Sequence, residues 1–458
     1  MSIETEFLVD AVGEDRVSTG EDALSEHASD WGTPTGRDPD VVVWPTSTEE
    51  VAAVLEAANE RNMPVTPYAA GTSLEGNPVP AQGGISMDIT RMNEVLDVRP
   101  DDFQMDLQPG VMGPTIGEKA GEHGLFFPPL PSSGDISTIG GMIANAASGM
   151  QTVKYGEIAD WVLELEVVLA DGSVLTAGSK AVKTSSGYNL RDLIVGSEGT
   201  LGIVTRATIE LAGRPQQIKG GRALFPDLNH ATAAVTDVVQ SGVDVAKIEL
   251  IDEESATISN AYTGADMPDS PMVFLEFHAD HGVDDEIDFC ESVLQAHDPI
   301  EFEIADEERM EDLWQARKDL AFAVRSYDPE KQPLHPGDVT VPISEYGPLI
   351  EYIKSLGEEY DILTPCFGHA GDGNVHYTAL VDPSDADELA AGEELYRKVV
   401  ERAIEVGGTA TGEHGIGQGK REYMLLEHGQ ETVDAMQTVK DALDPDGILN
   451  PGKIFPEE

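Results

Sequence analysis

The feature that most limits the possible folds of this chain is a pair of apolar runs that flank an amphipathic stretch and lead into a glycine-rich loop. The run VVVW (41–44) precedes a capping-box signal at 46–50, where Thr46 or Ser47 stands three residues before a glutamate. A second apolar run, PVTPY (64–68), continues into YAAGTSLEGNP (68–78). Between the runs, apolar residues recur at the spacing of one helix face: Val51, Val54, Leu55 and Ala58. The pattern predicts a β-α-β unit that ends at the glycine-rich loop.

The remainder of the first 210 residues is rich in predicted strands. They are expected near 95–98, 103–107, 161–169 and 199–211. The Asp171-Gly172 pair after the third of these predicts a hairpin turn. Helices are expected from Pro114 and, with many small residues, from Thr138 to Gly149. The polar run at 212–221 is a candidate domain boundary.

The second half alternates strands with longer helices. Strands are expected at 272–277 and 375–381, and helices at 306–325, 344–357 and 387–406. A helical tail ends in LNPGKIF (449–455). The predicted fold class is α+β, and 458 residues are too many for one ordinary core, so two or three domains are expected.

The charge of the chain is extreme. It carries 85 acidic residues against 28 lysines and arginines, a formal net charge of -57, spread along the whole length. Such a field repels nucleic acid and anionic membrane surfaces, and we expect no nucleic acid as a partner. We interpret the acids as a solvated surface adapted to molar salt, that is, a halophilic protein. Diluting the salt lengthens the screening distance to roughly 30 Å at 0.01 M, and we expect the chain to unfold there.

The cysteine content and the absence of long apolar stretches narrow the class of protein further. The two cysteines, Cys290 and Cys366, are too few for an iron–sulfur cluster or a disulfide framework. The sequence has no apolar stretch of transmembrane length, and its first ten residues carry acids where a signal peptide carries basic residues. We therefore expect a cytoplasmic protein with no transmembrane segment.

Two glycine-rich elements are candidates for phosphate binding. In the loop after 64–68, glycines free backbone N–H groups to point into one concavity; the candidate residues are Gly71, Thr72, Ser73, Leu74, Gly76 and Asn77. The second element, 137–145, has Thr138 as a helix N-cap followed by glycines, which suits a phosphate at a helix N-terminus or, alternatively, close helix packing. A third glycine-rich stretch, 187–205, does not match the Rossmann dinucleotide pattern.

Histidines gather in two short glycine-rich stretches of the second half. GHAGDGNVH (368–376) supplies His369 and His376, and GEHGIGQGKR (412–421) supplies Glu413 and His414. Two imidazoles and a carboxylate are a common ligand set for zinc, manganese or iron. The sequence therefore predicts a divalent metal site.

Arg317 lies within the apolar stripe of the helix predicted at 306–325. A charge that faces a core is costly unless it is paired. Two partners remain open from the residues alone: one of the many acids, in a salt bridge, or the carboxylate of a substrate, in a bidentate clamp.

Together these segments resemble the FAD-linked oxidoreductases of the vanillyl-alcohol-oxidase-like class. The resemblance runs from about 38 to 456 and is carried by motifs such as GTSLEGN (71–77), STIGGMIANAASG (137–149), VGSEGTLGIVT (195–205), GHAGDGNVH (368–376) and TGEHGIGQGKR (411–421). The most similar branch contains D-lactate dehydrogenase (cytochrome), the glycolate oxidase flavin subunit and D-2-hydroxyglutarate dehydrogenase.

The resemblance implies a two-subdomain FAD-binding domain, made of the β-α-β unit and a mixed sheet, followed by an α+β substrate domain with an antiparallel sheet. The expected segments are an N-terminal segment (1–37), the FAD-binding domain (38–213), the substrate and metal domain (214–420) and a helical tail that returns to the FAD domain (421–458). FAD is expected to be non-covalent, because the first loop has no histidine. Besides the first-loop residues above, the implied FAD-binding residues are Pro131, Asp135, Ser137, Thr138, Gly141, Asn145, Ser148, Gly149, Gly202, Ile203 and Asn450.

The resemblance also assigns roles in the second half. His369, His376 and Glu413 match the metal ligands of the family, His414 its base beside the flavin, and Arg317 its carboxylate-binding arginine. Where the hydroxyglutarate branch has a lysine that helps to hold its substrate, this chain reads His335-Pro336-Gly337. That departure favours a small substrate over a dicarboxylate.

The expected activity is therefore oxidation of a small D-2-hydroxy acid, D-lactate first, with electrons passed to a respiratory acceptor: a quinone, a cytochrome or an electron-transfer flavoprotein. The acceptor would make the protein peripheral to a membrane, and a homodimer is left open. Alternatives are a glycolate oxidase flavin subunit, a D-2-hydroxyglutarate dehydrogenase, a sibling with alkyl-transfer or amine chemistry, and a non-catalytic flavin electron-transfer subunit.

Overall fold

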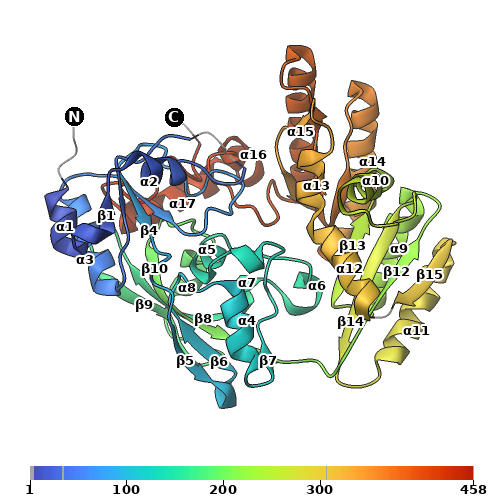
Figure 1. The fold of residues 1–458 in the computed structure, drawn as a ribbon, viewed down its shortest axis with the longest axis horizontal. Coiled ribbons are helices and arrows are strands. Elements are labelled where there is room, and N and C mark those ends of the chain that lie inside the picture. The colour runs from blue at the N-terminus through green and yellow to red at the C-terminus, as the bar shows by residue number, and fades with distance from the viewer. Residues whose placement is uncertain (1–4, 33–35, 306, 457–458) are drawn as a thin grey trace. The chain divides into compact units, whose positions relative to one another are not determined.

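The structure is a computed structural model that describes residues 5–32, 36–305 and 307–456 (Figure 1). Parts of the expected N-terminal segment, residues 1–4 and 33–35, and residue 306 of an expected helix lie outside the described residues. The chain forms two compact units. The first comprises Met1–Ser148, Gly156–Arg214 and Glu413–Glu458, and the second comprises Gly149–Tyr155 and Pro215–Gly412.

The first unit contains two main sheets. The four-stranded sheet has the order β1-β2-β4-β3, with β2, β4 and β3 parallel; its strands are β1 (Val17–Ser18), β2 (Val41–Val43), β3 (Val65–Tyr68) and β4 (Ile85–Asp88). The five-stranded antiparallel sheet has the order β5-β6-β10-β8-β9; its strands are β5 (Val95–Arg99), β6 (Gln104–Leu107), β8 (Val162–Val168), β9 (Val174–Gly178) and β10 (Ile203–Glu210). A short pair joins β7 (Leu125–Phe126) and β11 (Ala212–Gly213).

The helices of the first unit are α1 (Glu6–Val12), α2 (Glu21–Glu26), α3 (Thr48–Asn59), α4 (Gly113–Gly121), α5 (Ile139–Ala144), α7 (Ile158–Trp161), α8 (Leu190–Ile194), α16 (Met424–His428) and α17 (Gln430–Leu443). The three longest of these helices are α3, α4 and α17, with 12, 9 and 14 residues. Of the two N-cap candidates open in the sequence, Ser47 is the N-cap of α3 and its side chain accepts from the Glu50 N–H. The predicted β-α-β unit is confirmed as β2-α3-β3, and the four predicted apolar positions of α3 are all buried.

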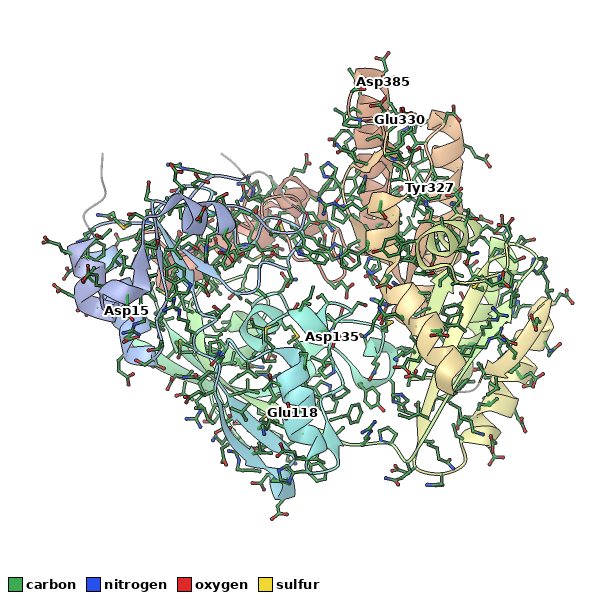
Figure 2. The ribbon with its side chains drawn as sticks, in the orientation of Figure 1. Asp15, Glu118, Asp135, Tyr327, Glu330 and Asp385 are labelled. Atoms are coloured by element: carbon green, nitrogen blue, oxygen red, sulfur yellow. The ribbon has the colours of Figure 1, made fainter. Side chains whose placement is uncertain are left out.

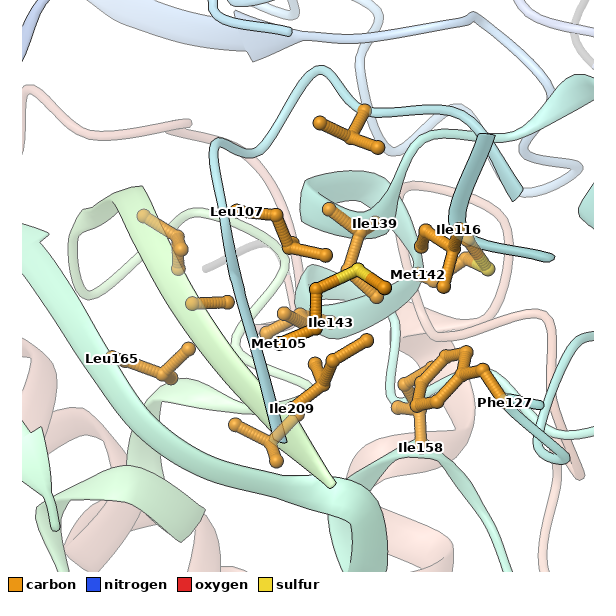
Figure 3. Close-up of a cluster of buried hydrophobic side chains, with 14 of the residues drawn as sticks. Met105, Leu107, Ile116, Phe127, Ile139, Met142, Ile143, Ile158, Leu165 and Ile209 are labelled. Atoms are coloured by element: carbon orange, nitrogen blue, oxygen red, sulfur yellow. The ribbon is translucent and has the colours of Figure 1, made fainter. Parts of the chain in front are cut away.

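The core of the antiparallel sheet is made by alternate residues of its strands and by α5. Figure 3 shows Met105 and Leu107 from β6, Leu165 from β8 and Ile209 from β10 against Ile139, Met142 and Ile143 from α5. Helix α5 is therefore fixed by its apolar face even though it has only six residues. This packing positions its N-terminus, which carries a predicted phosphate-binding turn.

The second unit is built on a seven-stranded antiparallel sheet with the order β15-β12-β14-β13-β18-β19-β17. The strands are β12 (Gln217–Leu224), β13 (Lys247–Ile251), β14 (Met272–Ala279), β15 (Glu301–Ala305), β17 (Gly337–Thr340), β18 (Cys366–His369) and β19 (Asn374–Tyr377); β16 (Gln332–Pro333) and β20 (Leu380–Val381) form a separate pair. The helices are α6 (Thr152–Tyr155), α9 (Leu228–Ser241), α10 (Glu253–Thr263), α11 (Val283–Leu294), α12 (Glu307–Lys318), α13 (Leu320–Ser326), α14 (Ile343–Tyr360) and α15 (Ala386–Glu405). The α+β fold class, with an antiparallel sheet in the second part and helices near the C-terminus, is confirmed.

Several predicted boundaries are wrong for local reasons. The helix expected from Thr138 to Gly149 ends at Ala144, because Ala146 takes the left-handed conformation at φ 47°. The helix expected at 306–325 is two helices, α12 and α13, which are separated at Asp319, where ψ is -5°. The strand expected at 375–381 is likewise divided into β19 and β20.

Exposed acidic residues lie on the surface of both units. Asp15, Glu118 and Asp385 are exposed and extend into solvent from their elements (Figure 2). Within the described parts of the chain, no helix combines the length and the apolar character that a bilayer span requires.

One buried acid in the first unit gives a prediction about stability. The Asp106 carboxylate is 1 % exposed and accepts from Arg99 Nη2 at 2.6 Å, Lys180 Nζ at 2.6 Å, Thr208 Oγ1 at 2.8 Å and the guanidinium of Arg206. Burial alone would raise the pKa of Asp106, but these four hydrogen bonds outweigh it and hold the pKa well below its ordinary value.

Replacing Asp106 with Asn is expected to lower the free energy of unfolding by about 2 kcal/mol at pH 7, because charge-assisted hydrogen bonds across β6 and β10 lose their anion. A depressed pKa stabilises the fold above the unfolded pKa of about 3.9, and the stabilisation disappears as the pH falls towards the folded value. Denaturant unfolding in molar salt should show a constant gap between wild type and variant from pH 7 to about pH 5 that narrows below pH 4. A gap that is independent of pH contradicts the assignment.

Candidate active site

The first glycine-rich loop follows β3 in the first unit and is held in place by Asp30. The Asp30 carboxylate accepts from Ser73 Oγ at 3.0 Å and from the Gly76 N–H at 2.8 Å. Gly71 and Gly76 take φ of 66° and 73°, a left-handed conformation that favours glycine. The hydroxyls of Thr72 and Ser137 are 2.9 Å apart. The two predicted phosphate-binding elements therefore adjoin within one unit.

The second element begins with Thr138, which is 1 % exposed and caps α5 by accepting from the Gly141 N–H at 3.2 Å. Packing explains one of its two glycines, Gly140, but not the other, Gly141. A Cβ on Gly140 would lie 2.5 Å from Cβ of Pro109, so this glycine is required by packing. A Cβ on Gly141 would meet only ordinary contacts, the nearest at 3.4 Å, so packing does not explain it.

A buried polar network joins the first loop to the C-terminal part of the first unit. Asn77 Nδ2 donates to Glu198 Oε2 at 2.7 Å and to Asn145 Oδ1 at 3.2 Å. Glu198 also accepts from the N–H groups of Ile416 and Gly417 at 2.7 and 2.9 Å. Burial raises the pKa of the Glu198 carboxyl, against the lowering effect of these donors. Glu198, which the sequence reading missed, therefore fixes the segment that follows Glu413 and His414.

The same network leaves two buried acceptors unused. Asn77 Oδ1 and Asn450 Oδ1 have no hydrogen-bond partner among the described residues, although Asn450 Nδ2 donates to the carbonyls of Asn77 and Glu198 at 3.0 and 2.7 Å. An unsatisfied buried acceptor costs about 1–3 kcal/mol. A polar ligand in this cradle would supply the missing donors, so the residues fit a hydroxyl-rich nucleotide cofactor.

The remaining predicted FAD-binding residues differ in their surroundings. Asp135 is exposed and Pro131 is half-buried. Gly202 approaches β8 so closely that a Cβ would lie 2.5 Å from Val167 Cγ1, and Ile203 is buried in the core. These two can face a ligand only with their backbone. Gly149 belongs to the second unit, where its N–H donates to Thr152 Oγ1 at 3.0 Å.

In the second unit, the sheet places four polar side chains in a row on one face. Glu249 on β13 stands opposite His369 on β18, and His376 on β19 stands opposite Phe367 on β18 and Asp338 on β17. Side chains two residues apart on a strand share a face, so Phe367 and His369 point the same way. The antiparallel register thus brings Glu249, Asp338 and both histidines together on one face. The first and last of these residues, 249 and 376, are 127 positions apart in the sequence.

The two histidines have the geometry of potential metal ligands. Their ring centroids are 5.2 Å apart with the rings at 88°, and they are 3 % and 9 % exposed. His369 Nδ1 lies 2.6 Å from Glu249 Oε1, which leaves Nε2 as the ring atom for a ligand. Two buried imidazoles, one oriented by a carboxylate, fit a divalent metal such as zinc.

Arg317 reaches this face from α12. Its Nε donates to Glu249 Oε2 at 2.8 Å, its Nη2 lies 2.7 Å from the same oxygen, and its Cζ lies 4.7 Å from the Phe367 ring centroid. The side chain is 5 % exposed. The sequence left two partners open for Arg317, and the structure shows one of them: an acid, Glu249, in a salt bridge. Both contacts with Glu249 use the edge of the guanidinium that carries Nε and Nη2.

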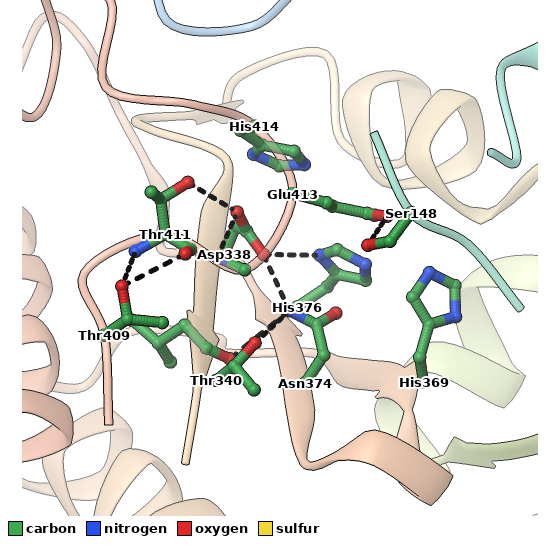
Figure 4. A network of polar contacts seen from close by, with 12 residues as sticks. Ser148, Asp338, Thr340, His369, Asn374, His376, Thr409, Thr411, Glu413 and His414 are labelled. Atoms are coloured by element: carbon green, nitrogen blue, oxygen red, sulfur yellow. Dashed lines mark hydrogen bonds and ion pairs between the residues drawn. The ribbon is translucent and has the colours of Figure 1, made fainter. Parts of the chain in front are cut away.

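Asp338 ties the end of the row to the turn that precedes Glu413 (Figure 4). Its carboxylate accepts from Asn374 Nδ2 at 2.7 Å, from Thr411 Oγ1 at 2.9 Å and from the Gly412 N–H at 2.9 Å, and lies 4.0 Å from His376 Nδ1. Asp338 is fully buried. Gly412 is the last residue of the second unit on this segment, and Glu413 follows it directly.

Glu413 and His414 belong to the first unit. Asn145 Nδ2 donates to the Glu413 carbonyl at 2.7 Å, and Ser148 Oγ donates to Glu413 Oε2 at 3.3 Å. His414 Nδ1 lies 3.9 Å from Glu75 Oε1 in the first glycine-rich loop. The predicted base therefore stands beside the predicted cofactor loop within one unit.

Two family models match the chain. Residues 39–178 match the model of an FAD binding domain, and residues 214–454 match that of the C-terminal domain of FAD linked oxidases. The chain is 37 % identical to a probable mitochondrial D-lactate dehydrogenase of Danio rerio over 97 % of this chain and 90 % of that protein. It is 36 % identical to the glycolate oxidase subunit GlcD of Bacillus subtilis over 92 % of this chain and 90 % of that protein.

Solved structures show the same fold at low sequence identity. An alkyldihydroxyacetonephosphate synthase matches with a TM-score of 0.79 at 21 % identity, over 98 % of this chain and 85 % of that one. The 4-ethylphenol oxidase of Gulosibacter chungangensis matches with a TM-score of 0.78 at 20 % identity, over 99 % of this chain and 97 % of that one. Since two family models and close relatives over nearly the full length agree, the chain belongs to the FAD-linked oxidases and is an FAD-dependent oxidoreductase similar to the D-lactate dehydrogenases.

Proposed function

We propose that this enzyme oxidises a small D-2-hydroxy acid, with D-lactate as the first candidate, to the 2-oxo acid, assisted by a divalent metal, and passes the electrons to a respiratory acceptor. The observation that carries the proposal is the row of buried polar groups on one face of the second unit: His369 and His376 lie side by side, and Glu249 joins His369 to Arg317. This combination suits a metal-bound hydroxy acid. The D-lactate dehydrogenase relatives support the substrate class.

We assign the metal to His369, His376 and Glu413. The Gly412 N–H donates to Asp338, and Asp338 lies directly opposite His376 on the neighbouring strand. Glu413 is the next residue after Gly412 in the chain. The ligand set of two imidazoles and a carboxylate is open to zinc, manganese or iron. FAD is assigned to the loop around Gly71–Asn77 and to the turn at Ser137–Gly141.

The chemistry divides among the residues of the chain. When bound, FAD supplies the acceptor for the Cα hydride and the metal lowers the pKa of the substrate hydroxyl. Arg317 binds the substrate carboxylate with the part of its guanidinium not used by Glu249 and so orients Cα. His414 accepts the hydroxyl proton on its imidazole, since a neutral imidazole is a base at working pH. Loss of this proton and of the Cα hydride leaves the 2-oxo acid.

The proposal of a small substrate is supported at His335. In the hydroxyglutarate branch a lysine of this region helps to hold the dicarboxylate. Here the His335 side chain is 44 % exposed, and its Nε2 lies 3.2 Å from Glu393 Oε2 on α15. A half-exposed imidazole already paired with an acid is a poor substitute for a lysine that binds a second carboxylate. We therefore favour lactate or glycolate over 2-hydroxyglutarate.

The test is an anaerobic spectral titration of the purified holoenzyme in molar salt with single 2-hydroxy acid enantiomers. D-lactate is expected to bleach the oxidised flavin band, L-lactate to leave it unchanged, and a chelator to slow bleaching strongly. Faster bleaching by glycolate than by D-lactate would favour the glycolate oxidase function, for which the GlcD relative is the specific support. No bleaching by any 2-hydroxy acid would indicate a non-catalytic electron-transfer subunit and overturn the proposal.

A further inference from the structure

Glu249 is a fully buried carboxylate at the centre of the second unit. It is 0 % exposed and lies on β13 within the strand KIELI, where its neighbours Ile248 and Leu250 are apolar core residues. Its two oxygens are divided between two partners. Oε1 lies 2.6 Å from His369 Nδ1, and Oε2 accepts from Arg317 Nε at 2.8 Å. One side chain therefore touches both a proposed metal ligand and the proposed substrate-binding arginine.

The position of this acid follows from strand register and from α12. Glu249 stands directly opposite His369 on β18, so the carboxylate and the imidazole meet across one strand pair. Arg317 lies on α12, whose Trp314 belongs to one core cluster with Phe274, and Phe274 on β14 is the other opposite neighbour of Glu249. A carboxylate buried here without partners would be strongly unfavourable, so its pairing is structurally required.

The pairing with Glu249 determines which ring nitrogen of His369 carries hydrogen. An ionised carboxylate only accepts hydrogen bonds, so the hydrogen shared over 2.6 Å belongs to Nδ1. The lone pair of the neutral ring then lies on Nε2, the atom turned away from Glu249. On the other side, the Nε and Nη2 edge of Arg317 faces Glu249, which fixes the plane of the guanidinium.

We propose that Glu249 is a positioning residue for the active site. It sets the tautomer and ring orientation of His369 and the plane of Arg317 at the same time, so a single carboxylate couples the metal site to the substrate clamp. The inference rests on the proposed function, because it takes His369 as a metal ligand. The competing explanation is that Glu249 only neutralises Arg317 and holds α12 on the sheet.

The chain contains a matched control for this competing explanation. Glu276 on the neighbouring strand β14 is also buried, 8 % exposed, and also joins a histidine to a cation. Its Oε1 lies 2.8 Å from His278 Nε2 and 2.8 Å from Lys247 Nζ. Neither partner belongs to the proposed site. Glu249→Gln and Glu276→Gln therefore remove the same charge from similar surroundings in one sheet.

The experiment measures the Zn²⁺ affinity of the full-length FAD-loaded protein by competition with a chromophoric chelator, together with thermal unfolding of the metal-free protein. Glu249→Gln is expected to weaken Zn²⁺ binding by about 10–100-fold, the usual effect of losing a carboxylate behind a histidine ligand. Glu276→Gln is expected to lower the unfolding temperature but to leave the Zn²⁺ affinity within about twofold of wild type. In a His369→Ala background, Glu249→Gln should cause no further loss, since its effect passes through that ring.

If Glu249→Gln folds poorly because Arg317 is left unpaired, the double variant Glu249→Gln/Arg317→Met removes both charges and restores folding. Its Zn²⁺ affinity is expected to stay as low as that of Glu249→Gln. Two negative outcomes distinguish failure of the positioning role from failure of the metal site. If His369→Ala loses Zn²⁺ but neither Glu249 variant does, the positioning role is refuted and the metal site stands. If His369→Ala binds Zn²⁺ as wild type does, the proposed metal site itself is wrong.

Discussion

Replacing His414 with alanine is expected to lower the rate of flavin reduction by D-lactate by about 100- to 10 000-fold, the usual contribution of a positioned general base. The FAD should remain bound, because the substitution leaves the anchor of the first glycine-rich loop in place. That loop is held by Asp30 through Ser73 and Gly76. Anaerobic stopped-flow absorbance at the flavin band measures the rate directly.

His428→Ala is the control for this prediction. His428 lies in the same C-terminal segment, at the end of α16, and its ring lies 3.7 Å from Glu427. It should leave flavin reduction within about twofold of wild type. Added imidazole is expected to restore part of the His414→Ala rate, since a free base can enter the space of the missing ring. A His414→Ala enzyme that is reduced at the wild-type rate refutes the base assignment.

The second large effect is expected at His376. His376→Ala removes one of three proposed ligands, so the metal content measured by plasma emission should fall from about one ion per chain to near zero. Flavin reduction by D-lactate should fall by about 1000-fold, because Lewis-acid assistance to the hydroxyl is worth several kcal/mol. The FAD absorbance should persist, since the residues assigned to FAD, except Gly149, lie in the first unit.

The matched control for His376 is His278→Ala. His278 is also buried in the seven-stranded sheet, where it lies 2.9 Å from the Tyr155 hydroxyl and 2.8 Å from Glu276. This variant should be less stable, but it should keep its metal and its rate of flavin reduction. A His376→Ala protein with full metal content contradicts the ligand assignment. Loss of metal with an unchanged rate contradicts the proposed role of the metal.

Local features of the fold are well predicted from the sequence because their causes are local. The β-α-β unit is visible in the Ser47 N-cap and four apolar positions of α3, and the hairpin β8–β9 is visible in its Asp171-Gly172 turn, where Gly172 has φ 81°. Predicted helix boundaries were wrong where the backbone conformation of a single residue ends the helix. Asp319 divides a continuous apolar periodicity into α12 and α13, and Ala146 ends α5 early.

The polar partners of the site could not be predicted, because they depend on strand register. Nothing in the sequence near 249 indicates that Glu249 stands opposite His369, 120 residues later. The available signal was only an acid inside an apolar strand. For Arg317 the sequence reduced the question to two partners, and the structure identifies one of them as Glu249.

The account depends on the convergence of His369, His376 and Glu413 on one ion. X-ray diffraction from holoenzyme crystals at the absorption edge of the bound metal tests it directly. We expect one anomalous peak about 2.0–2.2 Å from a ring nitrogen of each histidine and from a carboxylate oxygen of Glu413. A peak held by other residues, or a metal-free crystal of an enzyme that still reduces its flavin with D-lactate, would contradict the account.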